Sequence, residues 1–89
     1  MPYITQEARE QYAETLEFLP YIKTTGELNF ILSKICLSFI GQHDHCYDTL
    51  NSVHGVLGCV DKELYRRVTA VYEDEKLKVN GDLMEVTEV

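Results

Sequence analysis

The chain has 89 residues, of which 45% are hydrophobic, and its formal net charge is −7. So acidic a chain is excluded from open binding of nucleic acids, which requires clustered Lys and Arg. The length fits a single domain over residues 1–89, and the apolar share is that of a globular protein. Because a chain this short hides only about 60% of its unfolded surface, a monomer would have marginal stability.

Three observations predict a cytoplasmic protein that makes no membrane contact. Residues 1–7 carry neither the basic start nor the apolar core of a signal peptide. The longest apolar-rich run, 28–40, is interrupted by Asn29 and Lys34 and is too short to cross a bilayer. The cysteines at positions 36, 46 and 59 form an odd set, which favours reduced thiols.

A first helix is predicted over residues 6–19. Residues 1–4 before it favour an extended form, since Pro2 has no backbone N–H to donate. Thr5 is a suitable N-cap, and apolar side chains then recur at helical spacing. They are Ala8, Tyr12, Leu16 and Leu19. Pro20 is expected to end this helix.

A second helix is predicted over residues 26–40. Thr24 or Thr25 can cap it, and Glu27 favours its first turn. Its apolar residues nearly encircle the helix axis, so it needs cover on most sides. They are Leu28, Phe30, Ile31, Leu32, Ile35, Leu37, Phe39 and Ile40. Because two further helices of one small chain can hardly supply that cover, we expect a homo-oligomer with this helix at its interface.

The third predicted helix is the longest and covers residues 47–78. Apolar side chains follow one another there at intervals of three or four, which is the spacing of a helix with one buried seam. They are Leu50, Val53, Leu57, Val60, Leu64, Val68 and Val71. Asn80 and Gly81 form a stop signal, and residues 83–89 are expected to be either extended or disordered. The predicted fold is therefore all-α, with three helices, a long C-terminal helix and short extended termini.

A group of metal-binding residue types lies between the second and third helices. His43, His45 and Cys46 stand close together, with His54 and Cys59 further on. These types bind zinc, but their spacing matches no standard zinc finger, and a plain polar loop explains them as well. Cys46 beside histidines could act as a nucleophile, yet no oxyanion donor is identifiable. We therefore predict no metal, no cofactor and no catalytic residue.

Small and basic residues form a stripe on the third helix: Gly55, Gly58, Lys62 and Arg66. Two glycines inside a helix cost about 1 kcal/mol each relative to alanine, so some interaction should compensate. Close packing of another helix is one explanation. The other is approach of a ligand to bare backbone, with Lys62 and Arg66 binding a phosphate or carboxylate group.

Tyrosine and arginine residues mark a further candidate surface: Tyr65, Arg66, Arg67 and Tyr72. Glu63 precedes Arg67 by four residues, which favours an ion pair. Tyr65 and Tyr72 are seven apart and are expected to share a face. This combination fits a subunit interface, a set of surface ion pairs or a small-ligand pocket.

Several segments resemble a family of small uncharacterised proteins from bacteria and their phages. The similar segments are Met1-Pro2-Tyr3-Ile4, Gly26-Glu27-Leu28-Asn29-Phe30, Gly55-Val56-Leu57, Glu63-Leu64-Tyr65-Arg66-Arg67-Val68, Tyr72-Glu73-Asp74 with Lys76, and Asn80-Gly81-Asp82. The resemblance implies a phage or bacterial source. It carries no activity.

The sequence favours a small non-enzymatic binding or sequestering protein, which in a phage would inhibit a host or defence component in the host cytoplasm. Its partner would be a host protein or a small anionic molecule such as a signalling nucleotide. The rival hypotheses are a metal-dependent regulator or small enzyme built on His43, His45 and Cys46, and a purely structural oligomer.

Overall fold

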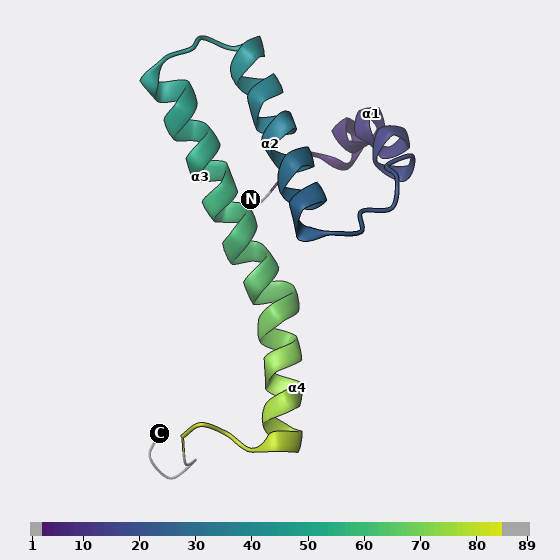
Figure 1. The fold of residues 1–89 in the computed structure, drawn as a ribbon, viewed down its shortest axis with the longest axis vertical. Helices are drawn as coiled ribbons and strands as arrows, with labels where there is room; N and C mark the ends of the chain where they lie inside the picture. Colours follow the sequence, from purple (N-terminus) through teal and green to yellow (C-terminus); the bar gives the residue numbers. More distant parts are fainter. Residues whose placement is uncertain (1–2, 85–89) are drawn as a thin grey trace. The chain divides into compact units, whose positions relative to one another are not determined.

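The computed structural model describes residues 3–84, and every regular element among them is helical (Figure 1). These elements are α1 (Gln6–Glu17), α2 (Thr25–Gln42), α3 (Tyr47–Leu64), the π-helical turn η1 (Tyr65–Thr69) and α4 (Ala70–Asn80). The all-α prediction is therefore confirmed over this range. The chain divides within α2 into two compact units, Met1–Ile35 and Cys36–Val89, and each is described by itself. Residues 85–89 of the predicted tail lie outside the described residues.

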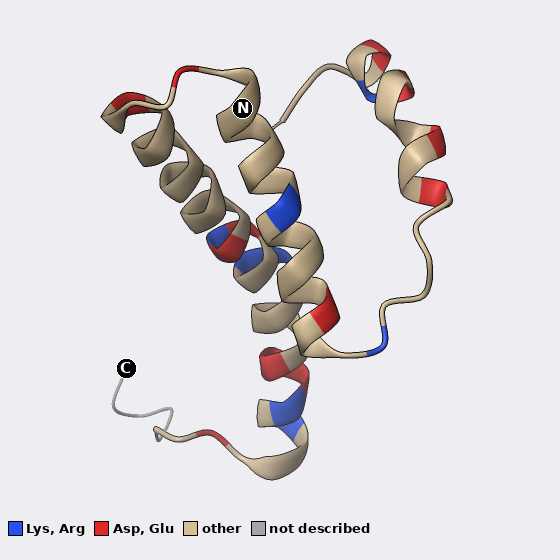
Figure 2. Cartoon of the chain, turned by 45° about the horizontal axis from the view of Figure 1, so that its top comes forward, with Lys and Arg blue, Asp and Glu red and all other residues tan. Residues whose placement is uncertain are grey.

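Helix α1 begins and ends for local reasons that the sequence carries. The Thr5 hydroxyl accepts a hydrogen bond from the backbone N–H of Ala8 at 3.2 Å, as expected of an N-cap. The helix ends at Glu17, two residues before the predicted end, because Leu19 precedes Pro20 and is disfavoured in helical conformation. Acidic residues recur along α1, where they colour the ribbon red (Figure 2). They are Glu7, Glu10, Glu14 and Glu17.

Helix α2 begins with reciprocal capping. Thr24 Oγ1 accepts from the Glu27 backbone N–H at 3.1 Å, while Glu27 Oε1 accepts from the backbone N–H of Lys23 at 3.1 Å. The helix starts at Thr25 and reaches Gln42, so the predicted range of 26–40 was short at both ends. At the C-terminal end, the Gln42 amide donates to Ser38 Oγ at 3.2 Å, one turn back, which supports the helix through Gly41.

A continuous helical segment, α3 with η1 and α4, forms most of the unit 36–89. It runs from Tyr47 to Asn80, about 50 Å at 1.5 Å per residue. The predicted stop is confirmed: Gly81 has φ of 93°, and its N–H donates to the Leu77 carbonyl at 2.9 Å. The prediction of three helices with a long C-terminal helix is confirmed, and within that long helix η1 inserts a wider turn.

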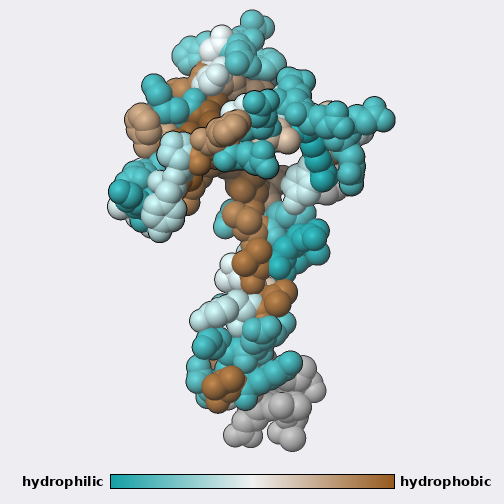
Figure 3. All heavy atoms as spheres, turned by 90° about the vertical axis from the view of Figure 1, so that its right-hand side faces the viewer, coloured by the Kyte–Doolittle hydropathy of each residue, from teal (hydrophilic) through white to brown (hydrophobic). Residues whose placement is uncertain are grey.

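The apolar seam is not buried within the described chain. None of residues 3–84 is fully buried, and large apolar side chains remain exposed on every helix. In the space-filling view, brown apolar residues follow the long helix in a line (Figure 3). The apolar residues of the long helix have the spacing that was expected of a buried seam, but their side chains remain exposed.

We predict that Thr24→Ala lowers the free energy of unfolding by about 1 kcal/mol, because it removes one capping acceptor and frees Glu27 from its reciprocal role. Thermal melts followed by circular dichroism at 222 nm measure this. Thr25→Ala is the control, since Thr25 is already the first helical residue. An equal loss in both variants would contradict the capping assignment.

Candidate binding surface on the long helix

The π turn sets which side chains share a face of the long helix. The Ala70 backbone N–H donates to the carbonyl of Tyr65, five residues back instead of four. The turn therefore holds one extra residue, and every residue after it is rotated by about 100° from its place in a regular α-helix. Two residues that lie in line on one face of a regular α-helix are seven apart in sequence. Across this turn, residues in line are eight apart.

Tyr65 and Glu73 demonstrate the shift. The Tyr65 hydroxyl donates to Glu73 Oε1 at 2.5 Å, across eight residues. In a regular α-helix the two would lie about 80° apart around the axis. The prediction that Tyr65 shares its face with Tyr72 is therefore wrong, because the extra residue brings Glu73 there instead.

The same bond changes the acidity of the phenol. The hydrogen bond to Glu73 and the charge of that carboxylate raise the pKa of Tyr65, since both favour the neutral phenol. The carboxylate of Asp74 acts in the same direction. Tyr65 is exposed, so solvent screens these interactions.

The arginines are arranged differently from the prediction. Arg66 donates to Glu63 Oε1 through Nη2 at 2.5 Å and through Nε at 3.1 Å, three residues apart. The sequence had predicted Arg67 as the partner of Glu63. The Arg66 side chain is 68% exposed, so this pair contributes only tenths of a kcal/mol. Arg66 therefore remains accessible from solvent.

A shallow surface depression lies beside the π turn. Its walls come from η1, α4 and the residue that ends α4, and include Tyr65, Tyr72 and Glu73. Lys76 Nζ stands 5.5 Å from the centroid of the Tyr72 ring, within range of a cation–π contact. The structure thus places Tyr65 and Tyr72 on the border of one depression, although they do not lie in line on the helix.

Gly55 and Gly58 face open space. A Cβ built on either glycine meets no atom of the described residues within 4 Å. Within the described part of the unit 36–89, no helix therefore packs closely against this stripe. Counted around α3 at 100° per residue, Gly55, Gly58 and Lys62 lie on the side opposite Val60 and Leu64. The stripe is therefore open for a ligand or for another molecule.

The predicted His and Cys residues between α2 and α3 have separate environments. His43 stacks on Phe39 with ring centroids 4.2 Å apart. Cys46 is the N-cap residue of α3, and its Sγ lies 3.6 Å from the Thr49 hydroxyl oxygen. The polar groups of Thr49, its backbone N–H first and its hydroxyl second, lower the pKa of the Cys46 thiol. Within residues 3–84, no three His, Cys, Asp or Glu side chains gather as a metal-binding group. The same residues include no helix long and apolar enough to cross a membrane.

Comparison with known proteins identifies the family of this chain. The model of the Domain of unknown function (DUF6899) matches residues 1–83. The chain belongs to this family. A search of curated proteins and a search of solved structures each gave no match. The family match confirms the resemblance to an uncharacterised family and assigns no activity.

Sequence reasoning missed Glu73 as a partner of Tyr65, although a signal was present. Val60, Leu64 and Val68 are separated by two consecutive gaps of four, where the seam otherwise alternates between three and four. Such a local change of period marks an irregularity in the helical repeat.

We predict that Tyr65 ionises above the ordinary tyrosine pKa of about 10. Because the folded-state pKa is raised, the hydrogen bond stabilises the fold fully below that pH and is lost as pH rises through the raised value. The difference in absorbance at 295 nm between wild type and Tyr65→Phe isolates this titration. Glu73→Gln should return it toward 10. A Tyr65 midpoint that is the same in wild type and Glu73→Gln would contradict the bond.

We also predict that Gly58→Ala raises the free energy of unfolding by about 1 kcal/mol, because alanine favours the helix and its methyl group meets open space. Chemical denaturation measures the change. Gly81→Ala is the opposite control: it should destabilise the chain, because φ is 93° there. A destabilising Gly58→Ala would instead indicate that another molecule packs against the stripe.

Proposed function

We propose that this protein is a non-enzymatic binding protein that sequesters a partner on the outer side of α3. The observation that carries the proposal is the open stripe of Gly55, Gly58, Lys62 and Arg66. Here two bare backbone positions lie beside two cationic side chains, and no described atom occupies the space over the glycines.

The chemistry of the stripe favours an anionic group. Glycine lets a ligand approach the backbone closely, and a guanidinium binds phosphate or carboxylate through two parallel hydrogen bonds. The net charge of −7 does not oppose this, because local charge governs a local site. The ligand class is a small anion such as a nucleotide, or an acidic segment of a host protein.

Sequestration, rather than turnover, is proposed because the stripe offers cations and bare backbone but no paired acid and base. The protein is further proposed to act as a homo-oligomer in the cytoplasm. For a phage-encoded member of the family, the partner would be a host or defence component.

Thermal melting of the full chain with a panel of nucleotides tests the proposal. A ligand at 100 times its Kd should add about 2.7 kcal/mol to the free energy of unfolding. Lys62→Ala combined with Arg66→Ala should abolish the shift, while Lys23→Ala on the connector before α2 should keep it. The bound ligand should be recovered chemically unchanged after heating.

Affinity capture from host extract tests the protein partner with the same three proteins. A partner of the stripe is retained by wild type and Lys23→Ala and lost from the double variant. If no nucleotide shifts the melt and the double variant retains the same proteins as wild type, the stripe is not the binding surface. Conversion of a ligand into product would show an enzyme instead.

A further inference from the structure

The apolar seam of the long helix becomes more exposed toward its C-terminal half. Leu50 and Val53 near the start of α3 are half-buried. Further along, the exposed fraction rises from 39% at Leu57 to 57% at Leu64 and 61% at Val68. In the unit 36–89, the other described helix is the end of α2, residues 36–42, only about 10 Å long. Most of the seam therefore has no cover within its own unit.

The seam continues in register through the π turn. Leu57 to Leu64 is a step of seven, Leu64 to Tyr72 is a step of eight across the extra residue, and Tyr72 to Val79 is again seven. On the second row, Val60 is followed by Val68 and then, seven residues on, by Glu75, so this row is apolar only as far as the π turn. Val71, predicted as part of the seam, is rotated away by about 100°, and Tyr72 takes its place.

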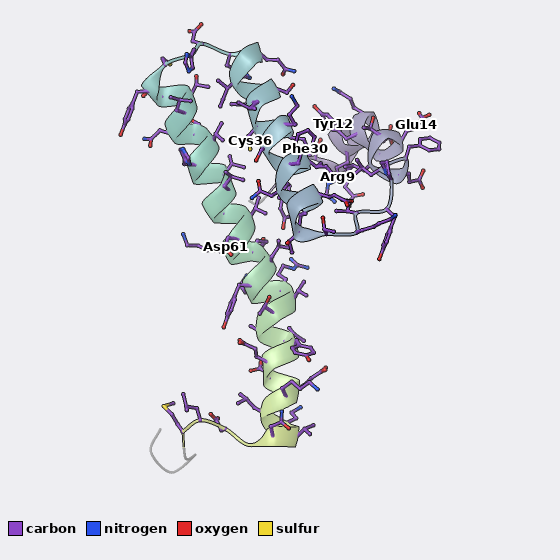
Figure 4. All side chains as sticks on the ribbon, viewed as in Figure 1. Arg9, Tyr12, Glu14, Phe30, Cys36 and Asp61 are labelled. Carbon is purple, nitrogen blue, oxygen red and sulfur yellow. The ribbon has the colours of Figure 1, made fainter. Side chains whose placement is uncertain are left out.

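Charged residues flank the two ends of this uncovered segment with opposite signs. Asp61 and Glu63 lie on either side of the seam between Val60 and Leu64, and Asp61 extends from α3 in Figure 4. Lys76 and Lys78 lie on either side of it between Tyr72 and Val79. Flanking positions of this kind decide orientation and partner choice in paired helices.

We propose that a second copy of this chain covers the segment from Val60 to Val79, antiparallel, with the two-fold axis beside Ala70. In this register Val60 of one copy meets Val79 of the other, Val68 meets Tyr72, and Leu64 meets Glu75. Asp61 then lies beside Lys76 of the other copy, and Glu63 beside Lys78. Each pair occurs twice by symmetry, so four opposite-charge pairs border the apolar contact.

The parallel alternative lacks this complementarity. Two copies aligned in the same direction place Asp61 level with Asp61 and Lys76 level with Lys76. Like charges at matched heights repel, whereas the antiparallel register makes every flanking pair attractive. The charge pattern therefore selects the antiparallel orientation as well as a second copy of this chain as the occupant.

The pairing rests on the proposal that this protein acts as a homo-oligomer. It leaves the proposed binding stripe on α3 exposed. Gly55, Gly58 and Lys62 lie on the opposite side of α3 from the seam. An antiparallel dimer would therefore present two such stripes, both facing outward.

Disulfide trapping in the full chain tests the orientation. The native cysteines at 36, 46 and 59 are replaced by serine, and circular dichroism first checks that helix content is unchanged. Val60→Cys and Val79→Cys are then made separately on chains with different tags. Antiparallel pairing predicts a crosslink between the two variants when mixed and none within either alone. Crosslinks within each variant alone, and none between them, would overturn it.

Charge reversal followed by sedimentation equilibrium provides the second measurement. Lys76→Glu should raise the dimer Kd by about tenfold, since two symmetric attractive pairs become repulsive. Asp61→Lys in the same chain should restore the wild-type Kd. A chain that stays monomeric at all concentrations would overturn both the pairing and the oligomeric part of the proposed function. A dimer whose Kd is unchanged by both substitutions would overturn the proposed pairing but would not bear on the binding stripe.

Discussion

The hydrogen bond from the Ala70 N–H to the Tyr65 carbonyl determines the face of every residue that follows it on the long helix. In a regular α-helical turn the N–H would donate to the carbonyl of the residue four back. Because it donates to the residue five back, the turn holds one extra residue. With that position, Tyr65 reaches Glu73, Tyr72 continues the apolar seam, and Val71 turns away from it. Without it, α4 would present a different set of side chains to any partner of α3.

The long helix therefore has two sides with different chemistry. One side carries an apolar seam that extends on both sides of the π turn, and its exposure rises along α3. The other side carries bare backbone at Gly55 and Gly58 next to Lys62 and Arg66. The two sides lie on opposite faces of α3, so a contact made on one side leaves the other side exposed.

The parts of the fold that depend on a few neighbouring residues were predictable from the sequence. The caps at Thr5 and Thr24 and the stop at Gly81 each follow from one side chain or one permitted backbone conformation. The π turn was not predicted, because it depends on a close competition between two backbone acceptors. The only sign of the π turn in the sequence is the pair of consecutive four-residue gaps between apolar residues that ends at Val68.

The candidate site was predictable in composition and not in arrangement. Lys62 and the glycines lie before the π turn, so ordinary helical counting places them correctly, and Arg66 is the second residue of the turn itself. Tyr72 lies after it, and counting assigns it to the wrong face. The burial of the apolar seam was not predictable either. The spacing of its residues depends on the long helix alone, whereas burial depends on whether another helix packs against them.

Helix α1 has a consequence of its own. Glu7, Glu10, Glu14 and Glu17 follow at intervals of three and four, so one side of α1 is a row of like charges. Neighbours in such a row repel, and dissolved ions screen them over about 10 Å at 0.1 M ionic strength. The helicity of α1 therefore depends on ionic strength, and a cationic surface that neutralised the row would stabilise this helix.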